Sequence, residues 1–380
     1  MNIIIHTQVY NGEKTLSRTI ESIINQTYKN FIYYISDNAS TDGTVAIIEK
    51  YAKKDERIIP AYNKTNEFYA YHNNVKECSK KYPDGYWAML DADDEYVPEF
   101  LEVMISYIKS NDLDIATCGI RAIDEETKKV KGYRQIHNDV IISGSGFCDH
   151  FCEYHTFMRN VCTKLFSLQL LNKCTFETVK GMSSYGGDTI FAIEAFANAK
   201  RVGILRKALH NVYFTMSSVS SRWESNRTDS ILIRDEFTRE FLIKKCGKIS
   251  PKNENFLHGV YFGSIKETLP VLFNPKLKLD YTDKVKYLNN MLSHEKTQEV
   301  LRVYSHEKLL DTDLRIPVVN WLLLQENCRM AEGAISAAEI IIIIYPKLSC
   351  VVGHDELMQF IMNAPDTLTQ ILNEYSSLGL

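Results

Sequence analysis

The chain has 380 residues, of which 45% are hydrophobic and 24% are charged, so it has the composition of a soluble globular protein with room for two domains. Its 44 Lys and Arg residues against 48 Asp and Glu residues give a formal net charge of −4, which excludes a broad basic surface for nucleic acid. We therefore expect any anionic ligand to be held locally, by a metal ion or by a few placed donors.

The nine cysteines are scattered without a paired framework, which indicates a reducing compartment and free thiols. One short group could be imagined as a zinc site, but it has no C-x-x-C spacing and no second ligand pair. This group consists of Cys148, His150, Cys152 and His155.

No basic leader segment follows Met1, and the longest apolar run, 334–345, is too short to span a bilayer. We expect a cytoplasmic protein and leave open peripheral attachment to the inner membrane face.

Strand and helix signals alternate along the first half of the chain. Apolar or β-branched runs predict strands at 2–7, 31–36, 57–62, 86–90 and 114–124. Helical spacing of apolar residues predicts helices at 15–26, 44–54, 67–82 and 97–109. Strands separated by helices of this length form a mostly parallel sheet flanked by helices, in which ligands bind beyond the carboxyl ends of the strands.

The second half of the chain changes character. A polar surface hairpin is expected at 125–135, and from about residue 225 the pattern is mainly helical. We therefore predict an α/β catalytic domain at 1–225 and a helical domain at 226–380. An acceptor, partner or homo-oligomerisation role for the helical domain is left open.

The sequence LDADDEY, residues 90–96, places several carboxylates at the end of a buried strand. Two carboxylates about 5 Å apart repel by roughly 3 kcal/mol at an effective dielectric near 20. Helix capping would explain one of these acids, but not a D-x-D-D cluster on a fixed backbone. A hard divalent cation, Mn²⁺ or Mg²⁺, would relieve the repulsion and bind the oxygens of a diphosphate. The chain has no glycine-rich phosphate loop that could do this instead.

Three motifs in order resemble glycosyltransferase family 2. They are the turn VYNGE, the junction from SIINQTYKNF to DNASTDGT, and the D-x-D of LDADDEY. The resemblance covers residues 1–125 firmly and extends more loosely to about 222. It implies the GT-A fold, a Rossmann-like α/β architecture, and inverting transfer from a nucleotide sugar.

The resemblance also assigns roles to residues. The ends of the first two strands would bind the base and ribose of a nucleotide sugar, with uracil as the expected base. In the D-x-D segment, Asp93 would bind the metal, Asp91 would contact the ribose or the metal's water shell, and Asp94 would support them. Glu95 is expected at the surface. The nucleotide-sugar residues implied are Gln8, Val9, Tyr10, Asp37, Asn38, Asp91, Ala92 and Asp93.

Asp188 lies in the segment SSYGGDTIFAIEAF, at the expected start of an amphipathic helix. Considered alone it is a helix cap, with Gly186 and Gly187 allowing a close backbone approach. In the resembled family an acid at this place is the catalytic base, and we expect that role for Asp188. A sugar hydroxyl needs such a group because it is a poor nucleophile until its proton is removed.

Two further features are weaker. Lys164, in VCTKLFSLQLL, either faces the active site or is solvated. In residues 208–221 the family's Arg and His are missing and His210 is offset, although Tyr213 and Ser218 fit. Arg222 could replace the missing Arg near the diphosphate.

We therefore expect a metal-dependent inverting glycosyltransferase that uses a nucleotide-sugar donor, with UDP as the expected nucleotide. The acceptor would be a hydroxyl of a glycan, glycolipid or glycoprotein. One alternative is a non-catalytic module that binds nucleotide sugars or glycans. The other is a sugar-phosphate nucleotidyltransferase, which the lack of a glycine-rich basic loop after the first strand disfavours.

Overall fold

The computed structural model forms two compact units. The first comprises residues 1–220 with 236–253, and the second comprises 221–235 with 254–380. The residues described are 2–67, 69, 71–177, 185–214, 222–272, 277–280, 283–284, 286–287, 290–291 and 294–303. Residues 304–380, which include about half of the expected helical domain, lie outside the described part.

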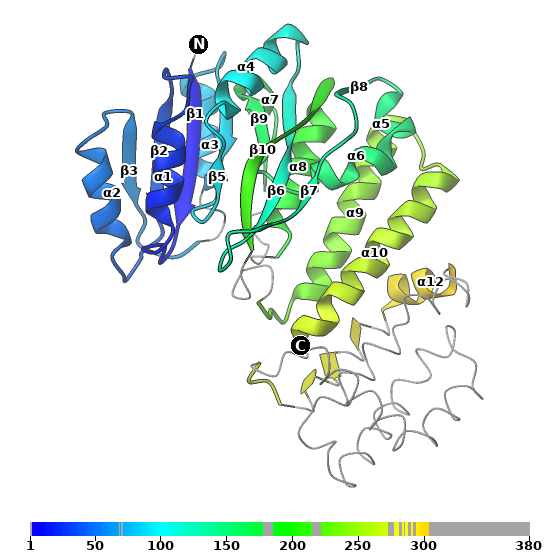
Figure 1. Cartoon of the computed structure of the whole chain (residues 1–380). Helices are drawn as coiled ribbons and strands as arrows, with labels where there is room; N and C mark the ends of the chain where they lie inside the picture. Colours follow the sequence, from blue (N-terminus) through cyan, green and yellow to red (C-terminus); the bar gives the residue numbers. More distant parts are fainter. Residues whose placement is uncertain are drawn as a thin grey trace. The chain divides into compact units, whose positions relative to one another are not determined.

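The first unit alternates strands and helices along the chain, as the sequence predicts (Figure 1). Up to the acidic segment the elements are β1 (Ile3–Val9), α1 (Leu16–Ile24), β2 (Ile32–Asp37), α2 (Thr44–Ala52), β3 (Ile58–Tyr62), α3 (Tyr71–Lys81) and β4 (Tyr86–Met89). They continue with β5 (Glu95–Tyr96), α4 (Phe100–Ser110), β6 (Ile115–Asp124), β7 (Val130–Arg134), β8 (Val140–Ser143), α5 (Gly146–Asp149) and α6 (Phe151–Met158). Then follow β9 (Lys164–Ser167), α7 (Leu168–Leu171), α8 (Gly187–Asn198) and β10 (Arg201–Phe214).

These strands form one sheet in the order β3-β2-β1-β4-β9-β6-β10-β5, with β7 on β6 and β8 on β10. Strands β3, β2, β1 and β4 are parallel, and β6 is parallel to β10. Strand β9 is antiparallel to both β4 and β6 and separates the two parallel groups. The α/β expectation is therefore confirmed, with antiparallel strands added in the second half. Strands β5, β8, β9 and β10 were not predicted as such, and β5 is only two residues long.

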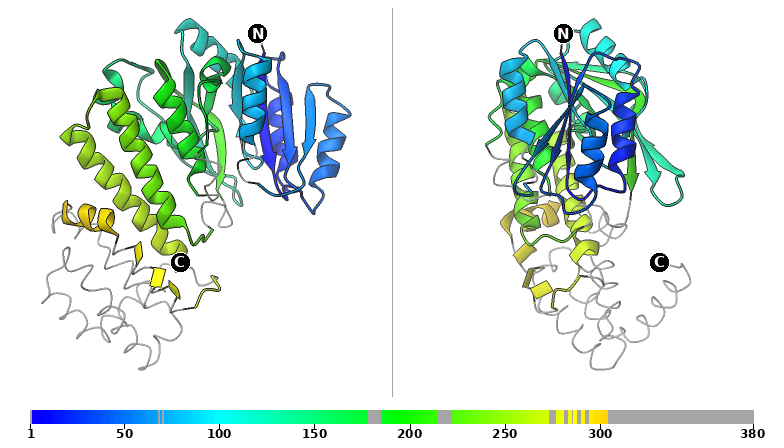
Figure 2. Two further views of the ribbon diagram at one scale, coloured as in Figure 1. Left: turned by 180° about the vertical axis from the view of Figure 1, so that it is seen from behind. Right: turned by 90° about the vertical axis from the view of Figure 1, so that its left-hand side faces the viewer.

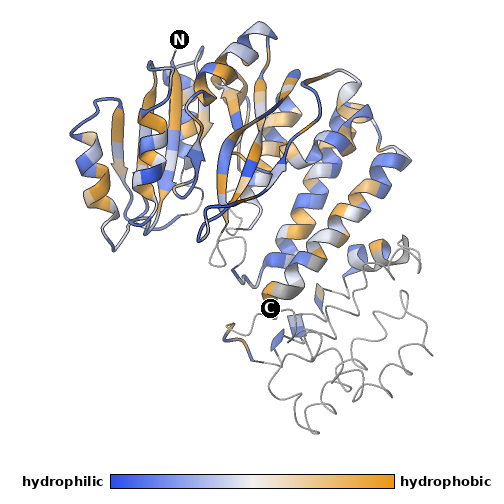
Figure 3. Cartoon of the chain, viewed as in Figure 1, coloured by the Kyte–Doolittle hydropathy of each residue, from blue (hydrophilic) through white to orange (hydrophobic). Residues whose placement is uncertain are grey.

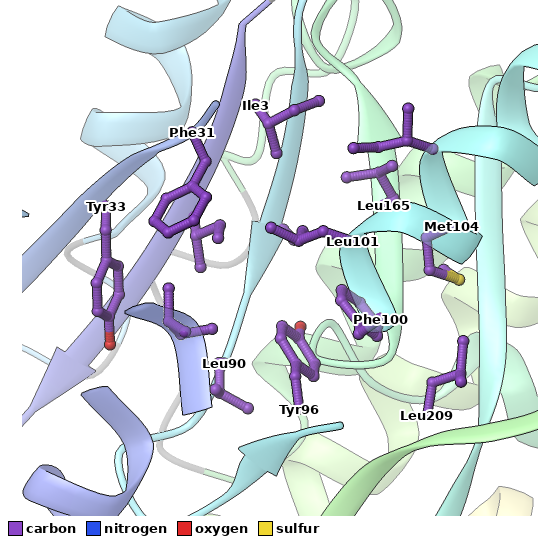
Figure 4. Packing of buried hydrophobic residues seen from close by; sticks show 14 of the residues in the cluster. Ile3, Phe31, Tyr33, Leu90, Tyr96, Phe100, Leu101, Met104, Leu165 and Leu209 are labelled. Carbon is purple, nitrogen blue, oxygen red and sulfur yellow. The ribbon is translucent and has the colours of Figure 1, made fainter. Parts of the chain in front are cut away.

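Helices cover both faces of this sheet (Figure 2). On one face, apolar side chains of β1, β2 and β4 pack with those of α1, α2 and α4 in a single cluster (Figure 4). Each fully buried Leu, Ile or Phe side chain contributes about 1.5–3 kcal/mol to such a core. The colouring in Figure 3 shows the same pattern, with apolar residues on the strands and polar residues in the connecting loops.

On the other face an aromatic cluster packs α3 and α8 against β4. The Trp87 ring lies 5.8 Å from that of Phe191, and Phe191 stacks on Phe176 with 4.1 Å between ring centres. Tyr71 completes the cluster, 6.1 Å from Trp87. Because Phe191 lies one helical turn after Asp188, this packing fixes the start of α8 relative to the sheet.

The expectation of free thiols is wrong for two cysteines. Cys148, at α5, and Cys246, at the end of α9 (Arg227–Cys246), form a disulfide with their Cα atoms 5.9 Å apart. Both belong to the first unit, because residues 236–253 pack with it. The bond also removes the imagined zinc site, and His150 of that group pairs instead with Glu153 at 3.1 Å. Sequence spacing could not reveal a pair separated by 98 positions.

The second unit is helical where it is described. Its helices include parts of α9 and α10 (Pro251–Leu272) and α12 (Glu295–Val303). Nε2 of His258 lies 3.2 Å from Glu254 and 3.3 Å from Glu299, and Lys296 pairs with the same oxygen of Glu299. We interpret this group as an ion-pair network. Among the described helices, none is both long and apolar enough to cross a membrane.

Candidate active site

The loops after β1 and β2 are joined by side-chain hydrogen bonds at the carboxyl edge of the sheet. The main-chain N–H of Asn11 donates to Oγ of Ser40 over 2.8 Å, and that of Thr41 donates to Oδ1 of Asn11 over 2.8 Å. Asn11 and Ala39 adopt positive φ angles of 51° and 62°. Such backbone conformations are uncommon outside glycine and persist only where surrounding contacts hold them. Both turns are therefore fixed before any ligand binds.

Asp37 is the buried acid of this region, with 3% of its surface exposed. Its Oδ2 accepts a hydrogen bond from the main-chain N–H of Ser40 over 3.1 Å, as in an Asx turn. Its Oδ1 is buried and has no hydrogen-bond partner. A buried oxygen of this kind is costly unless a ligand donor satisfies it, so Asp37 fits a binding role better than a turn alone.

Gln8 and Asn38 use their amide groups differently from expectation. Nε2 of Gln8 and Nδ2 of Asn38 both donate to the main-chain oxygen of Glu67, over 3.0 and 2.9 Å. Oδ1 of Asn38 accepts from Nδ2 of Asn63 over 2.7 Å. These two side chains therefore hold the segment before α3, which leaves Asp37 and the exposed ring of Tyr10 available for a base.

Val9, at the end of β1, has a structural role. It is buried, and its main-chain oxygen accepts a hydrogen bond from the N–H of Asn38 over 2.8 Å. The contact joins the end of β1 to the end of β2. A nucleotide would meet the backbone of Val9 rather than its side chain.

The D-x-D segment begins where β4 ends. Thr7 donates from Oγ1 to the main-chain oxygen of Leu90 over 2.9 Å, which fixes the last residue before the acids. The N–H of Asp94 then donates to the oxygen of Asp91 over 3.2 Å and closes a turn. Asp91 and Asp93 are solvent accessible, and Ala92 between them is half-buried. The two outward carboxylates form no ion pair within the described residues.

The surroundings of these acids disfavour negative charge. Desolvation, followed by repulsion from Asp94 and Asp93, raises the pKa of Asp91 to about 7. Desolvation and Asp94 raise the pKa of Asp93 to about 6. Asp94 is itself buried, and desolvation raises its pKa to about 7. Although Asp91 and Asp93 are reached by solvent, nearby protein limits their hydration, so a cation would stabilise both charges.

Arg18 of α1 stabilises the acidic turn. Its Nη2 donates to the main-chain oxygen of Asp93, and its Nη1 pairs with Oε1 of Glu125 at 2.9 Å. Its Cζ lies 3.7 Å from the centre of the Tyr213 ring. The hydroxyl of Tyr213 donates to Glu95, which is half-buried on β5. The expectation that Glu95 is an ordinary surface acid is therefore wrong.

Asp94 joins the acidic turn to the far end of β10. Its Oδ1 accepts a hydrogen bond from the main-chain N–H of Tyr213 over 3.0 Å, and its Oδ2 lies 3.0 Å from Nε2 of His210. Burial lowers the pKa of His210 to about 4, so the ring is neutral near pH 7. Asp94 therefore links the acidic turn to β10, and its supporting role at a metal site stays a prediction. His210, which the sequence analysis described as offset, is a neighbour of the acids.

Asp188 lies in the first turn of α8, after Gly186 with φ of 98°. Its Oδ1 accepts a hydrogen bond from the N–H of Thr189 over 2.8 Å. The close backbone approach expected at the glycine pair is to Tyr69, whose hydroxyl accepts from the N–H of Gly187 over 2.9 Å. A Cβ on Gly187 would lie 2.2 Å from Cζ of Tyr69. Only glycine therefore fits between Tyr69 and the acid.

Asp188 and the D-x-D segment share neighbours. Burial raises the pKa of Tyr71 and of the Cys162 thiol, and the charges of Asp91 and Asp188 add to both shifts. Cys162 also forms a side-chain hydrogen bond with Asp91. The folded chain thus brings together acids that are 97 positions apart (188 − 91) in the sequence.

The remaining predicted residues have mixed outcomes. Lys164 is fully buried at the start of β9, so it is not a solvated lysine. Arg222 is exposed and belongs to the second unit, and its proposed role near the diphosphate stays a prediction. Ser218 lies outside the described residues. Sequence reasoning missed Arg18, Tyr71, Cys162 and His210, because their role depends on contacts between distant segments.

The acids present fit a hard divalent cation. Asp91 and Asp93 offer accessible carboxylate oxygens that lack a cationic partner, and such oxygens are the ligands that Mg²⁺ and Mn²⁺ prefer. Among the described residues of this unit, no third His, Cys or acid converges with them closely enough to complete a protein cage. One or two protein ligands leave coordination positions for phosphate oxygens and water.

Comparison with known proteins agrees with this fold. Residues 4–175 match the family model "Glycosyl transferase family 2". EpsE of Bacillus subtilis (strain 168), which is named as a glycosyltransferase, is 34% identical over 146 residues, or 37% of this chain and 51% of EpsE. The chain thus spans about half the length of this curated relative.

Solved structures of TarS from S. aureus (residues 1–349) are similar in fold. The complex with UDP aligns with a TM-score of 0.57 at 16% identity, covering 89% of this chain and 91% of that chain. The complex with UDP-GlcNAc gives a TM-score of 0.56 at 17% identity, covering 91% and 92%.

The mixed α/β sheet with helices on both faces and an acidic turn after β4 defines a GT-A fold. Within that class, residues 4–175 are similar to glycosyltransferase family 2.

Proposed function

We propose that this protein is an inverting, metal-dependent glycosyltransferase that moves a sugar from a UDP-sugar to an acceptor hydroxyl. The observation that supports it best is the meeting of the D-x-D acids with Asp188 around Tyr71 and Cys162. One group of acids suits a metal and a diphosphate, and the separate acid suits proton removal. Transfer between a donor and an acceptor requires both functions in one place.

The proposed donor site lies at the ends of β1, β2 and β4. Tyr10 presents an exposed ring for stacking on the base, and Oδ1 of Asp37 can accept a hydrogen bond from its edge. Uracil offers such an N–H donor, and the fold is shared with TarS structures that contain UDP and UDP-GlcNAc. Mn²⁺ or Mg²⁺, held by Asp93 with Asp91, would neutralise charge that develops on the departing diphosphate.

Asp188 is the proposed catalytic base. It would take the proton of the acceptor hydroxyl as the hydroxyl oxygen attacks the anomeric carbon from the face opposite the diphosphate. The new carbon–oxygen bond forms as the bond to the diphosphate breaks, and the configuration inverts. The aromatic packing of Phe191 and the fit of Gly187 against Tyr69 hold the acid in place.

The test is release of UDP from UDP-sugars in the presence of Mn²⁺, with and without candidate acceptors. We expect slow hydrolysis alone and faster turnover with the right acceptor. Asp188→Asn should abolish turnover and leave UDP affinity nearly unchanged, because the amide keeps the shape but cannot take a proton. Near-normal turnover of Asp188→Asn would remove the base assignment.

A second candidate is a non-catalytic module that binds a nucleotide sugar or a glycan. Saturable UDP-sugar binding without any release of UDP would favour it. The acceptor classes remain a glycan, glycolipid or glycoprotein. Peripheral membrane association stays open, and a homo-oligomer would form through the proposed helical domain at 226–380.

A further inference from the structure

Arg134, the last residue of β7, has two guanidinium nitrogens without a hydrogen-bond acceptor among the described residues. Its Nε and Nη2 atoms are buried and have no hydrogen-bond partner. Its Cζ lies 5.9 Å from the centre of the Phe157 ring on α6, which accepts no hydrogen bond from either atom. A buried cation with unsatisfied N–H groups is costly, so it indicates a missing anionic partner.

Lys164 adds a second buried cation nearby. Its Nζ donates to neutral oxygens only, namely the main-chain oxygen of Asn160, its Oδ1 at 2.9 Å and Oγ1 of Thr163 at 3.4 Å. Burial followed by the charge of Arg134 lowers the pKa of Lys164 to about 7, and burial followed by Arg159 lowers that of Arg134 to about 10. Arg134 therefore disfavours the charged form of Lys164, and no carboxylate pairs with either residue among the described residues.

We call Arg134 and Lys164 the basic cluster. The segment that precedes Lys164 contacts the start of α8, where the proposed base lies. Oγ1 of Thr189, the residue after Asp188, donates to the main-chain oxygen of Arg159 over 2.6 Å. The charge of Asp188 acts on Lys164, and the charges of Asp91, Asp93, Arg134 and Lys164 all act on His210. The strand register also places Arg134 close to His210, because both residues pair with Ile120 of β6, from opposite sides.

We propose that the basic cluster binds a phosphate or carboxylate group of the acceptor and directs a nearby hydroxyl to Asp188. The inference rests on the proposed function and specifies its acceptor as an anionic glycan. The guanidinium fork suits both anions, because two parallel N–H groups match two oxygens. The diphosphate of the donor would be bound by the metal proposed at Asp91 and Asp93, so the cluster is assigned to the acceptor.

The first experiment measures binding of inorganic phosphate by calorimetry, with UDP and Mn²⁺ at saturation so that the donor site is filled. We expect saturable phosphate binding to the wild-type chain that is at least about tenfold weaker in Arg134→Gln. Lys131→Gln is the matched control, because Lys131 is an exposed cation on the same strand, paired with Asp124 at 2.6 Å. It should bind phosphate as the wild type does. Absence of phosphate binding to the UDP-loaded wild type would overturn the proposal whether or not Arg134→Gln folds.

The second experiment compares acceptors that share one hydroxyl array and carry a phosphate, a carboxylate or no charge. Arg134→Gln should lower kcat/KM for the better anionic acceptor at least about tenfold more than for the neutral one, and Arg134→Lys should recover part of the loss. The preferred anion distinguishes a sugar phosphate from a uronic acid. Equal losses for charged and neutral acceptors would contradict the proposal, whereas no UDP release from any donor would contradict the proposed function alone.

Discussion

The main-chain N–H of Tyr213 donates a hydrogen bond to Oδ1 of Asp94 over 3.0 Å and thereby joins the end of β10 to the acidic turn after β4. The two residues are 119 positions apart. Arg18 completes the connection, because it stacks on Tyr213 and donates to the main chain of Asp93. The outward carboxylates thus depend on a supporting layer that binds no ligand itself, as is usual around metal sites.

Arg18→Met tests that supporting layer. Loss of its contacts with Asp93 and Glu125 should let the acidic turn shift, so we expect Mn²⁺ affinity and donor KM to worsen by about tenfold or more. The direct ligands stay in place, so binding should be weakened and not abolished. Calorimetric titration of Mn²⁺ with UDP measures the effect.

Arg57→Met is the matched control for Arg18→Met. Arg57 also pairs with an acid, Asp55 at 2.6 Å, and also lies over a ring, that of Phe31 at 4.3 Å. These contacts do not involve the acidic turn, so Arg57→Met should leave Mn²⁺ affinity unchanged. Equal effects of the two variants would show that Arg18 has no special role.

The raised pKa values of the acidic turn predict a pH dependence. Asp91 and Asp94 have pKa values of about 7 and Asp93 of about 6, all above their ordinary value. At pH values between the unfolded and the folded pKa of an acid, the folded chain binds more protons than the unfolded chain. The stability of the metal-free protein therefore falls as pH rises through about 4 to 7. Mn²⁺ needs the deprotonated acids, so its affinity should rise over the upper part of this range.

Thermal unfolding at several pH values, with a chelator and with Mn²⁺, measures both effects. The Tm should fall with rising pH in chelator, and the increase in Tm on addition of Mn²⁺ should become larger as the pH rises. Asp93→Asn should reduce that growth. A metal-induced gain that does not change between about pH 5 and pH 8 would be inconsistent with these acids as ligands.

Gly187→Ala tests the fit that positions Asp188. The new Cβ would lie 2.2 Å from Cζ of Tyr69, so either the ring or the start of α8 must move. We expect a stability loss of about 1–3 kcal/mol and a large loss of turnover with donor affinity retained. Denaturant unfolding and UDP binding separate the two effects.

Gly263→Ala provides the comparison. Gly263 lies in α10, where a Cβ would meet nothing within 4 Å. Alanine has the better helix propensity, so this variant should gain up to about 1 kcal/mol. Gly187→Ala with wild-type stability and turnover would mean that the contact with Tyr69 does not position the acid.

The Cys148–Cys246 disulfide should stabilise the first unit. It closes a loop of 98 positions, and such bonds contribute about 2–4 kcal/mol, largely by restricting the unfolded chain. Cys148→Ser should lose about this amount in denaturant unfolding, whereas Cys152→Ser, at a free cysteine four positions along, should lose much less. Alkylation of Cys148 before reduction would show that the bond does not form.

The sequence predicted what depends on local pattern. Alternating apolar runs and helical faces located β1 to β4, α1 to α4 and the β6–β7 hairpin, and the strand-end motifs placed Asp37 and Asp93 at the ends of β2 and β4. Asp188 lies at a helix start, as its segment predicts. Short strands such as β5 and β9 were missed because they are defined by their neighbours more than by their own residues.

Long-range contacts explain the other differences. The amides of Gln8 and Asn38 bind Glu67 in a distant loop, Glu95 is held by Tyr213, and His210 reaches Asp94 only through the pairing of β10 with β5. No spacing rule within one segment encodes these contacts. The same holds for the basic cluster, whose two members lie on different strands.

The most direct test of the account is calorimetric titration of UDP into the wild-type chain and into Asp93→Ala, each with Mn²⁺ and with a chelator. If Asp91 and Asp93 hold a metal that binds the diphosphate, Mn²⁺ should tighten UDP binding to the wild type by at least about tenfold. Asp93→Ala should lose that difference and bind UDP weakly under both conditions. Equal UDP affinity of the wild type with and without metal would contradict the central claim.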